Sequence, residues 1–416
     1  RRVLFRSDLN VDSEELYGPK MKRNQVFQKI IEDLDFAIQW LPEAGSEEAN
    51  RLNKDIARHV KARFCLNEGT HYKYHDELEY ASEAEKWLQM AATESDKLIT
   101  SGRYEIYNTG HPQEDYFNMY RIDDKSDLKE AVLYVDYKTN IREHNMAAAG
   151  REAGCGFSKS FVESFLCSDG LPISLSNKYL GDETMRKETA NRDPRLKQLI
   201  LTNDFPTNVT DDLKDSTFVV NEDEFITQHC FTGYRPIKGF NPIYSQALYM
   251  KSSFDGIAYR YAETLLINAE AKAELNTITN ADLDRTVNQL RDRVGMPHLT
   301  VNVGFTDPKW PDWGYSLSPV LQEIRRERCI ELAGEGFRFN DLKRWKAGKL
   351  LNNVLTYVGK RKPDGNLAIV YPNYTNPDLS YQAGKSRTWE DKMYLYPIPT
   401  GELQRNPQLL PQNPGW

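Results

Sequence analysis

The stretch Val320–Leu350 carries charged side chains on a face where an amphipathic helix would carry apolar ones. When its first half is wound as an α-helix, at about 100° per residue, Arg328 and Glu335 fall on the face of Leu321 and Ile324. Carboxylates in such a setting could work as general acids or bases. Buried charges are tolerated only when they are paired, however, and paired charges also occur in purely structural helices. We therefore interpret the stretch as an ion-paired structural element rather than a catalytic cluster.

The expected ion network pairs Arg325 and Arg328 with Glu331 and Glu335. Three charged residues in the second half of the stretch would extend the network: Arg338, Asp341 and Arg344. Two glycines, at positions 334 and 336, lie between the two halves, and glycine breaks or bends a helix. The stretch should therefore form two helices, the second over residues 337–350.

Further amphipathic helices must position this stretch. Apolar residues at three- and four-residue spacing predict five of them: residues 17–41, 53–68, 84–99, 257–273 and 281–294. Pro42, Gly69 and Gly102 stand where the first three should end, and Asn280 should cap the last. Short loops favour antiparallel neighbours, so we expect helix pairs of tetratricopeptide size in two blocks, residues 17–102 and 257–354.

The remaining segments are irregular. Residues 104–250 are broken by Gly, Pro, Asn and Asp, and they hold short strand-like runs at 131–137 and 217–220. The block N-R-D-P-R-L should form a turn into a short helix, with Arg192 and Arg195 available for carboxylates. Residues 355–416 should form a loop-rich, extended tail. The predicted architecture is one composite, mostly α domain over residues 1–416, with an irregular, partly β insertion.

Composition excludes several classes of protein. The net charge is −7, from 54 basic and 61 acidic residues, and no long basic run occurs, so no nucleic-acid partner is expected. Five unclustered cysteines without a C-x-x-C motif make a structural zinc site unexpected. No transmembrane run or signal peptide is visible, and the chain begins R-R-V-L-F without Met. We expect that it starts inside a longer precursor.

Several motifs in the C-terminal half resemble, in the same order, those of the SusD/RagB nutrient-binding lipoproteins of Bacteroidetes. The most specific match is I-x-x-E-R-x-I-E-L-A-G-E-G-x-R-x-x-D-L-x-R-W at Ile324–Trp345. The others are the blocks at Asn191–Leu196, Tyr259–Glu274 and Val287–Pro297, the ending L-Y-P-I-P…N-P-Q-L-L-P-Q-N-P-G-W, and a weaker match at Phe161–Ile173.

The resemblance implies an α/α superhelix of tetratricopeptide-like helix pairs and a role in capture rather than catalysis. It implies an oligosaccharide or, as the alternative, a peptide ligand, which is passed to a SusC-like TonB-dependent transporter of the outer membrane. It also implies a lipid anchor on an N-terminal Cys, which this chain lacks, and a location on the extracellular face. A glycoside hydrolase with two carboxylates is the less favoured alternative, because no G-x-S-x-G, H-E-x-x-H or P-loop motif is present.

Sugars require flat aromatic rings for their C–H faces and planar polar groups for their hydroxyls. The loop P-K-W-P-D-W-G-Y-S is the richest source of both, with Trp310, Trp313 and Tyr315 as a stacking platform and Asp312 and Lys309 as polar partners. The alternative is that one or both Trp rings plug the loop onto the scaffold.

Two further segments could contribute rings. In H-Y-K-Y-H, Tyr72 and Tyr74 are candidates, whereas the histidines at 71 and 75 have the spacing of a helical metal pair but lack a third ligand. A loop between helices is the simpler interpretation there. In the tail, Tyr371, Tyr374 and Trp389 could line a rim. No cofactor is expected, and Ca²⁺ at the acidic groups near residues 123–127 and 211–212 lacks the EF-hand spacing.

Overall fold

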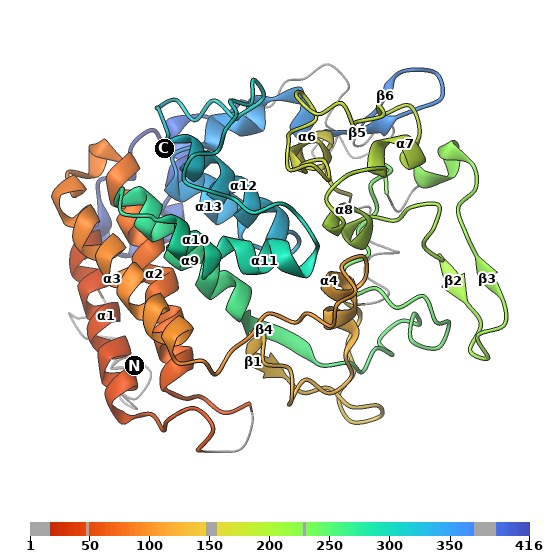
Figure 1. Ribbon diagram of the computed structural model, residues 1–416. Coiled ribbons are helices and arrows are strands. Elements are labelled where there is room, and N and C mark those ends of the chain that lie inside the picture. Colours follow the sequence, from red (N-terminus) through yellow and green to blue (C-terminus); the bar gives the residue numbers. More distant parts are fainter. Residues whose placement is uncertain (1–16, 47–49, 147–155, 228–229, 370–387) are drawn as a thin grey trace.

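The computed structural model describes residues 17–46, 50–146, 156–227, 230–369 and 388–416, and this part of the chain is mostly helical, as predicted (Figure 1). The longer helices are α1 (Arg23–Trp40), α2 (Lys54–Tyr74), α3 (Ala81–Thr100), α9 (Tyr261–Glu274) and α12 (Pro319–Glu331). The shorter ones are α4 (Asp115–Asn118), α6 (Lys159–Ser164), α7 (Met185–Thr189), α8 (Arg195–Leu199), α10 (Asn280–Asp284), α11 (Val287–Arg293), α13 (Arg338–Arg344) and α14 (Thr400–Arg405).

Helices α1, α2 and α3 stand side by side at one end of the molecule, and α9 and α12 continue from them toward the centre (Figure 1). The side chain of Asn53 caps α2 by accepting from two backbone N–H groups. We predicted that α2 would end before Gly69, but it runs on to Tyr74. The reason is packing: a Cβ at Gly69 would lie 2.9 Å from the Leu88 side chain. This glycine lets α3 approach α2 closely instead of ending the helix.

The second helical block differs from the prediction in its details. Residues 256–260 form a strand before α9 begins, and the predicted helix over 281–294 is divided into α10 and α11. Thr279, rather than Asn280, caps α10 in a reciprocal capping box with Asp282. Sequence reasoning placed the cap one residue late, because both Thr and Asn are good capping residues.

Strands pair only in twos within the described residues. They are β1 (Ala131–Val135) with β4 (Gly256–Arg260), β2 (Asn208–Val209) with β3 (Ser216–Thr217), and β5 (Val358–Arg361) with β6 (Leu367–Ile369), all antiparallel. The predicted run 131–137 is therefore a strand, and it joins the irregular insertion to the start of α9. The β2–β3 pair lies at the end of the molecule opposite α1 (Figure 1).

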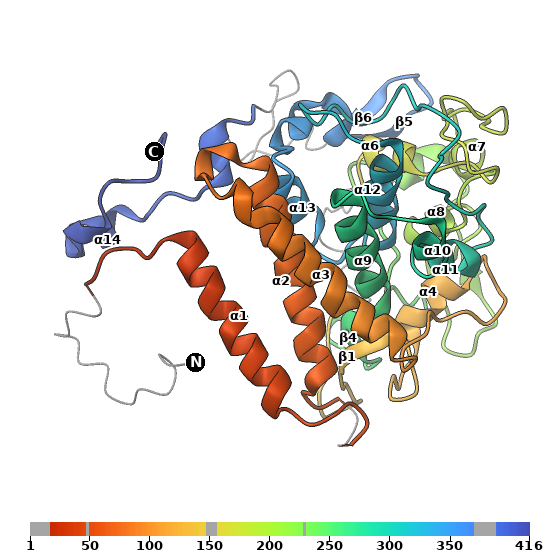
Figure 2. The same ribbon diagram turned by 60° about the vertical axis from the view of Figure 1, so that its left-hand side comes forward.

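The predicted break between α12 and α13 is confirmed. Gly334 and Gly336 have φ angles of +75° and +82°, a region that favours glycine. The second helix is shorter than the predicted span 337–350: α13 ends at Arg344, and a 3₁₀ turn, η5 (Gly348–Asn352), follows it. The tail does not wrap as fully extended chain either, since it contains α14. Its end lies beyond α1 (Figure 2), where Lys20 donates to the Pro411 carbonyl at 3.1 Å.

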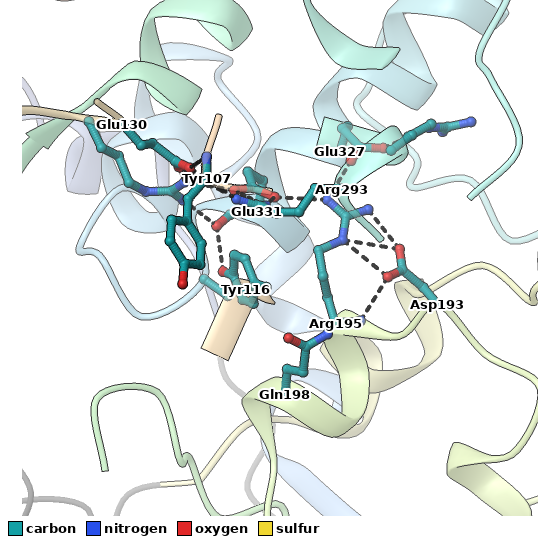
Figure 3. A network of polar contacts seen from close by, with 12 residues as sticks. Tyr107, Tyr116, Glu130, Asp193, Arg195, Gln198, Arg293, Glu327 and Glu331 are labelled. Atoms are coloured by element: carbon teal, nitrogen blue, oxygen red, sulfur yellow. Dashed lines mark hydrogen bonds and ion pairs between the residues drawn. The ribbon is translucent and has the colours of Figure 1, made fainter. Parts of the chain in front are cut away.

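A buried charge network occupies the centre of the molecule (Figure 3). The Glu331 carboxylate accepts from Arg293 at 2.6 Å, from Arg260 at 2.6 Å and from Arg195 at 2.9 Å. Burial alone would raise the pKa of Glu331, but the three guanidinium groups, Arg293 foremost, hold it well below its usual range. Arg195 also binds Asp193 and Glu327, as predicted for the N-R-D-P-R-L block, whereas Arg192 of the same block donates to three backbone carbonyls and, among the described residues, to no carboxylate.

Asp341 and Arg344 extend the network, as predicted, but the partners expected for Arg325 and Arg328 are wrong. Arg325 pairs with Glu274 at 2.8 Å and Arg328 with Asp341 at 2.9 Å, so neither arginine pairs with Glu331 or Glu335. Glu335 pairs instead with Arg260 and Lys238. Arg344 joins the network through Glu270 and Asp341. Arg338 is exposed and has no ion pair among the described residues. Apart from the Arg326–Glu323 pair, at 3.2 Å within α12, the charges of this helix are neutralised by other elements rather than along the helix itself.

Candidate functional site

A cavity of about 1060 Å³ lies against α12, α13, α6 and the loop over residues 307–313. One side of α12 forms its floor, with Gln322, Arg326 and Cys329 among the residues. The turns after α13, including η5, complete the wall. We call this space the first cavity. Because its floor is anchored by the buried charge network, the groups that line it are held on a rigid element.

The two Trp residues of the predicted platform behave differently. Trp310 is half-buried, lines the first cavity, and donates its indole N–H to Glu323 at 2.7 Å. Trp313 also lines the cavity but is only 6% exposed, since it meets Trp345 edge-on at 5.5 Å and stacks with the Arg325 guanidinium at 4.8 Å. Trp313 therefore plugs the loop onto the scaffold, the alternative raised by the sequence, and Trp310 is the ring left for a ligand.

Most of the other predicted rings do not reach this cavity. Tyr315 and Tyr74 stack on each other at 4.4 Å and are not part of its lining. Tyr72 is fully buried in the core, so the prediction that it contacts a ligand is wrong. Trp389 is half-buried and closes over Gly348, beside the cavity rather than in it. Tyr371 and Tyr374 lie outside the described residues.

Polar groups complete the lining of the first cavity. Asp312 is exposed and accepts from the Gly314 N–H, and Lys309 pairs with Glu163 at 3.3 Å. Asp307 accepts from Arg326 at 2.6 Å. Burial would raise the pKa of Asp307, but hydrogen bonds from Arg326 foremost, and then from the Lys309 N–H and the Ser174 hydroxyl, hold this pKa below its usual range. Both polar partners proposed from the sequence thus line the cavity, although only Asp312 lacks an ion-pair partner among the described residues.

Sequence reasoning missed the rings that come from other elements. Phe161 of α6 and Phe339 of α13 both line the first cavity, and Phe339 is 45% exposed. Phe339 lies within the motif Ile324–Trp345, but its exposure follows from how α13 packs and could not be inferred from the sequence. The position of Phe161 was equally hidden, because it depends on how the irregular insertion folds back onto α12.

The histidine pair is a structural feature of the end of α2. His71 and His75 stack at 4.0 Å, and the His75 ring bonds the Lys343 carbonyl and Glu77. The loop interpretation of this segment is therefore wrong. Among the described residues, no group of three or more His, Cys, Asp or Glu side chains is placed to hold a metal ion.

We expect acid to destabilise the protein partly through His71. Burial lowers the pKa of this imidazole to about 2, and the charges of Arg23, His75 and Lys343 act in the same direction. The unfolded chain, with a His pKa of about 6.5, binds a proton that the folded state excludes, so stability falls as pH drops below about 6.5. Between about pH 7 and about pH 5 this group alone should remove about 2 kcal/mol.

Urea unfolding of wild type and His71→Phe across this range measures the effect. The variant should lose less stability on acidification than wild type, whereas a control His298→Phe, at an exposed site, should follow wild type. Equal slopes for His71→Phe and wild type would contradict the assignment.

Comparison with known proteins decides the family. A sequence profile of the SusD family matches residues 94–416. The chain belongs to the SusD family. SusD-like protein P2 of Formosa agariphila is 24% identical over 410 residues, which cover 95% of this chain and 66% of that protein. The chain thus spans slightly less than two thirds of this relative's length.

Solved structures show the same SusD fold. A SusD-like protein from Bacteroides fragilis superposes with a TM-score of 0.68 at 24% identity, covering 96% of this chain and 72% of that one. A second protein of that species, described as a SusD-like carbohydrate binding protein, gives 0.65 at 21% identity, with 96% and 73% covered. In the described part of this SusD-family chain, no helix is both long and apolar enough to cross a membrane.

Proposed function

We propose that this SusD-family protein binds oligosaccharides in the first cavity at the cell surface and delivers them to a SusC-like TonB-dependent transporter. One observation carries the binding role: the cavity combines fixed aromatic rings, Trp310, Phe161 and Phe339, with hydrogen-bonding side chains. Rings offer faces to sugar C–H groups, and side-chain amides and carboxylates bond the hydroxyls. The description of one structural relative as carbohydrate binding supports this ligand class.

We further propose that the protein has no catalytic role. A glycosidase needs a carboxylic acid whose pKa is raised so that it can donate a proton near neutral pH. Of the four carboxylates that line the first cavity in the described part of the chain, Asp307 and Asp341 are instead buried beside arginines, which despite that burial hold their pKa values below the usual range. Glu163 pairs with Lys309, and Asp312 is exposed. Incubation with a panel of polysaccharides should release no product, and turnover lost on a single carboxylate substitution would contradict the proposal.

Membership of the SusD family suggests how the protein is attached to the membrane and which partner it has. We propose that it is attached to the outer membrane by a lipid on an N-terminal Cys of its precursor, with the helix pairs acting as a tetratricopeptide-like scaffold. Affinity purification from native membranes checks the partnership. We expect a TonB-dependent transporter to copurify, and a membrane complex without one would count against delivery to a transporter.

Trp310→Ala should weaken glycan binding about tenfold and leave stability nearly unchanged. The ring is half-buried and its N–H is tethered to Glu323, so it is preorganised for stacking at little cost in ordering. Loss of one well-placed ring costs about 1.4 kcal/mol, a factor of about ten. Isothermal titration with a glycan that wild type binds measures the change.

Trp40→Ala is the matched control, because Trp40 is 68% exposed on α1 and does not line the cavity. It should bind as wild type does. Unchanged affinity in Trp310→Ala would remove this ring from the site.

A further inference from the structure

A second cavity, of about 820 Å³, adjoins the first. It lies between α2, the segments 236–239 and 254–258, and the turn that joins α12 to α13. Six residues line both cavities: Gly156, Phe157, Gly334, Gly336, Phe337 and Asp341. The two spaces are therefore neighbours that meet over one short turn.

The shared turn places little side-chain bulk between the two cavities, because two of its residues are glycines. Gly334 and Gly336 both adopt positive φ, and a Cβ added at Gly336 would have no heavy atom within 4 Å. The backbone at this position thus faces open space. A chain-like ligand in one cavity can continue over the turn into the other without meeting a side chain at Gly336.

Most charged residues of the second cavity are ion-paired within the protein. Arg63 bonds the Glu263 carboxylate, Lys238 pairs with Glu335 at 2.6 Å, and Asp341 accepts from Arg328 and Arg344. The two remaining charged residues bond the backbone: Lys125 donates to the Ile122 carbonyl, and Asp255 accepts from two N–H groups. Lys125 and Asp255 are only 1% and 5% exposed, so a ligand with a net charge would find no accessible, unpaired counter-charge here, and the cavity favours uncharged units.

Two amides in this cavity have no such internal partner. Within the described ranges, the side chains of Asn67 on α2 and Asn340 on α13 form no hydrogen bond. Each offers a carbonyl oxygen and an NH₂ group in one plane, a match for neighbouring sugar hydroxyls. Phe64, 39% exposed, adds a ring to the same lining. Free amides beside an exposed ring are the composition of a neutral sugar site.

We propose that the two cavities form one groove for a linear oligosaccharide, whose uncharged units occupy the second cavity on Asn67, Asn340 and Phe64. This inference rests on the proposed function, glycan binding in the first cavity, and adds the length and the charge of the ligand. It predicts that affinity rises with chain length until the glycan reaches across the Gly334–Phe337 turn.

Titration calorimetry with size-graded ladders tests the groove. The probes are linear gluco-, manno- and xylo-oligosaccharides and oligogalacturonides, from disaccharide to octasaccharide. For the ladder that wild type binds, the longest members should bind about tenfold more tightly than the shortest. The double variant Asn67→Ala/Asn340→Ala should lose this gain and keep the affinity for short members. Asn340→Trp, which places a bulky ring in the second cavity, should do the same.

Asn302→Ala is the control, since Asn302 is an exposed asparagine that lines neither cavity. It should retain the gain with length. Binding that is independent of length, or a gain that survives in both Asn340 variants, overturns the groove while leaving glycan binding intact. A wild-type protein that binds no member of any ladder overturns glycan binding itself, and the groove with it.

Discussion

Glu331→Gln should remove about 3–5 kcal/mol from the free energy of unfolding, because breaking a buried ion pair leaves uncompensated charge. The carboxylate contacts three arginines that are each no more than 1% exposed. Arg195 and Arg260 keep other carboxylates in the variant, whereas Arg293 keeps only its longer contact to Glu130 at 3.4 Å. The loss should therefore arise mainly at Arg293.

Urea unfolding followed by circular dichroism measures this loss. Glu402→Gln provides the matched control, since Glu402 pairs with Arg405 at an exposed site where both side chains are at least half exposed. Such surface pairs contribute about 0–1 kcal/mol. If both variants unfolded at the same urea concentration, the buried charge network would not contribute substantially to the free energy of unfolding.

Trp313→Ala should also be strongly destabilising, by about 3 kcal/mol. Its ring is 6% exposed, packs against Trp345, and donates its N–H to Gln322 at 2.6 Å. Truncation would leave a cavity, take away the ring beside Arg325, and orphan the Gln322 oxygen. The sequence indicated that Trp313 belongs to the stacking platform, from which we would expect weaker binding and little loss of stability on truncation; its burial reverses that expectation.

Thermal and urea unfolding of Trp313→Ala, Trp310→Ala and Trp40→Ala separate the two roles. Only the first variant should show a large loss, because Trp310 is half-buried and Trp40 is exposed. A stable Trp313→Ala protein with weakened glycan binding would restore the original prediction.

The helices were largely predictable because their apolar spacing and caps are local signals. Asn53, Gly102 and the two glycines at 334 and 336 stand at helix boundaries, as predicted. The exception, Gly69, shows the limit: a glycine needed for close packing of α3 looks the same in sequence as a glycine that ends a helix. The strand before α9 was missed because its partner, β1, lies more than a hundred residues earlier in the chain.

The site was less predictable, because burial is decided by distant residues. The sequence indicated that α12 must carry paired charges, but Glu331 finds its arginines on β4, α8 and α11. The Trp loop was correctly identified as special, yet nothing local distinguishes Trp310, which faces the first cavity, from Trp313, which packs on Trp345. Asn67 and Asn340 lack any motif, and only the packing of α2 beside α13 brings them into one cavity.

The central network also constrains the order in which the chain folds. Glu331 lies 136, 71 and 38 residues from Arg195, Arg260 and Arg293, whereas α2 and α3 are consecutive helices that can pair as soon as they form. Contacts that close long loops tend to form late, because the chain loses conformational entropy before it gains the energy of the contact. We therefore expect the α2–α3 hairpin to form early and the three arginines to contact Glu331 late. Interactions made after the folding barrier slow unfolding more than they speed folding, so we expect this network to contribute mainly by lowering the rate at which the folded protein unfolds.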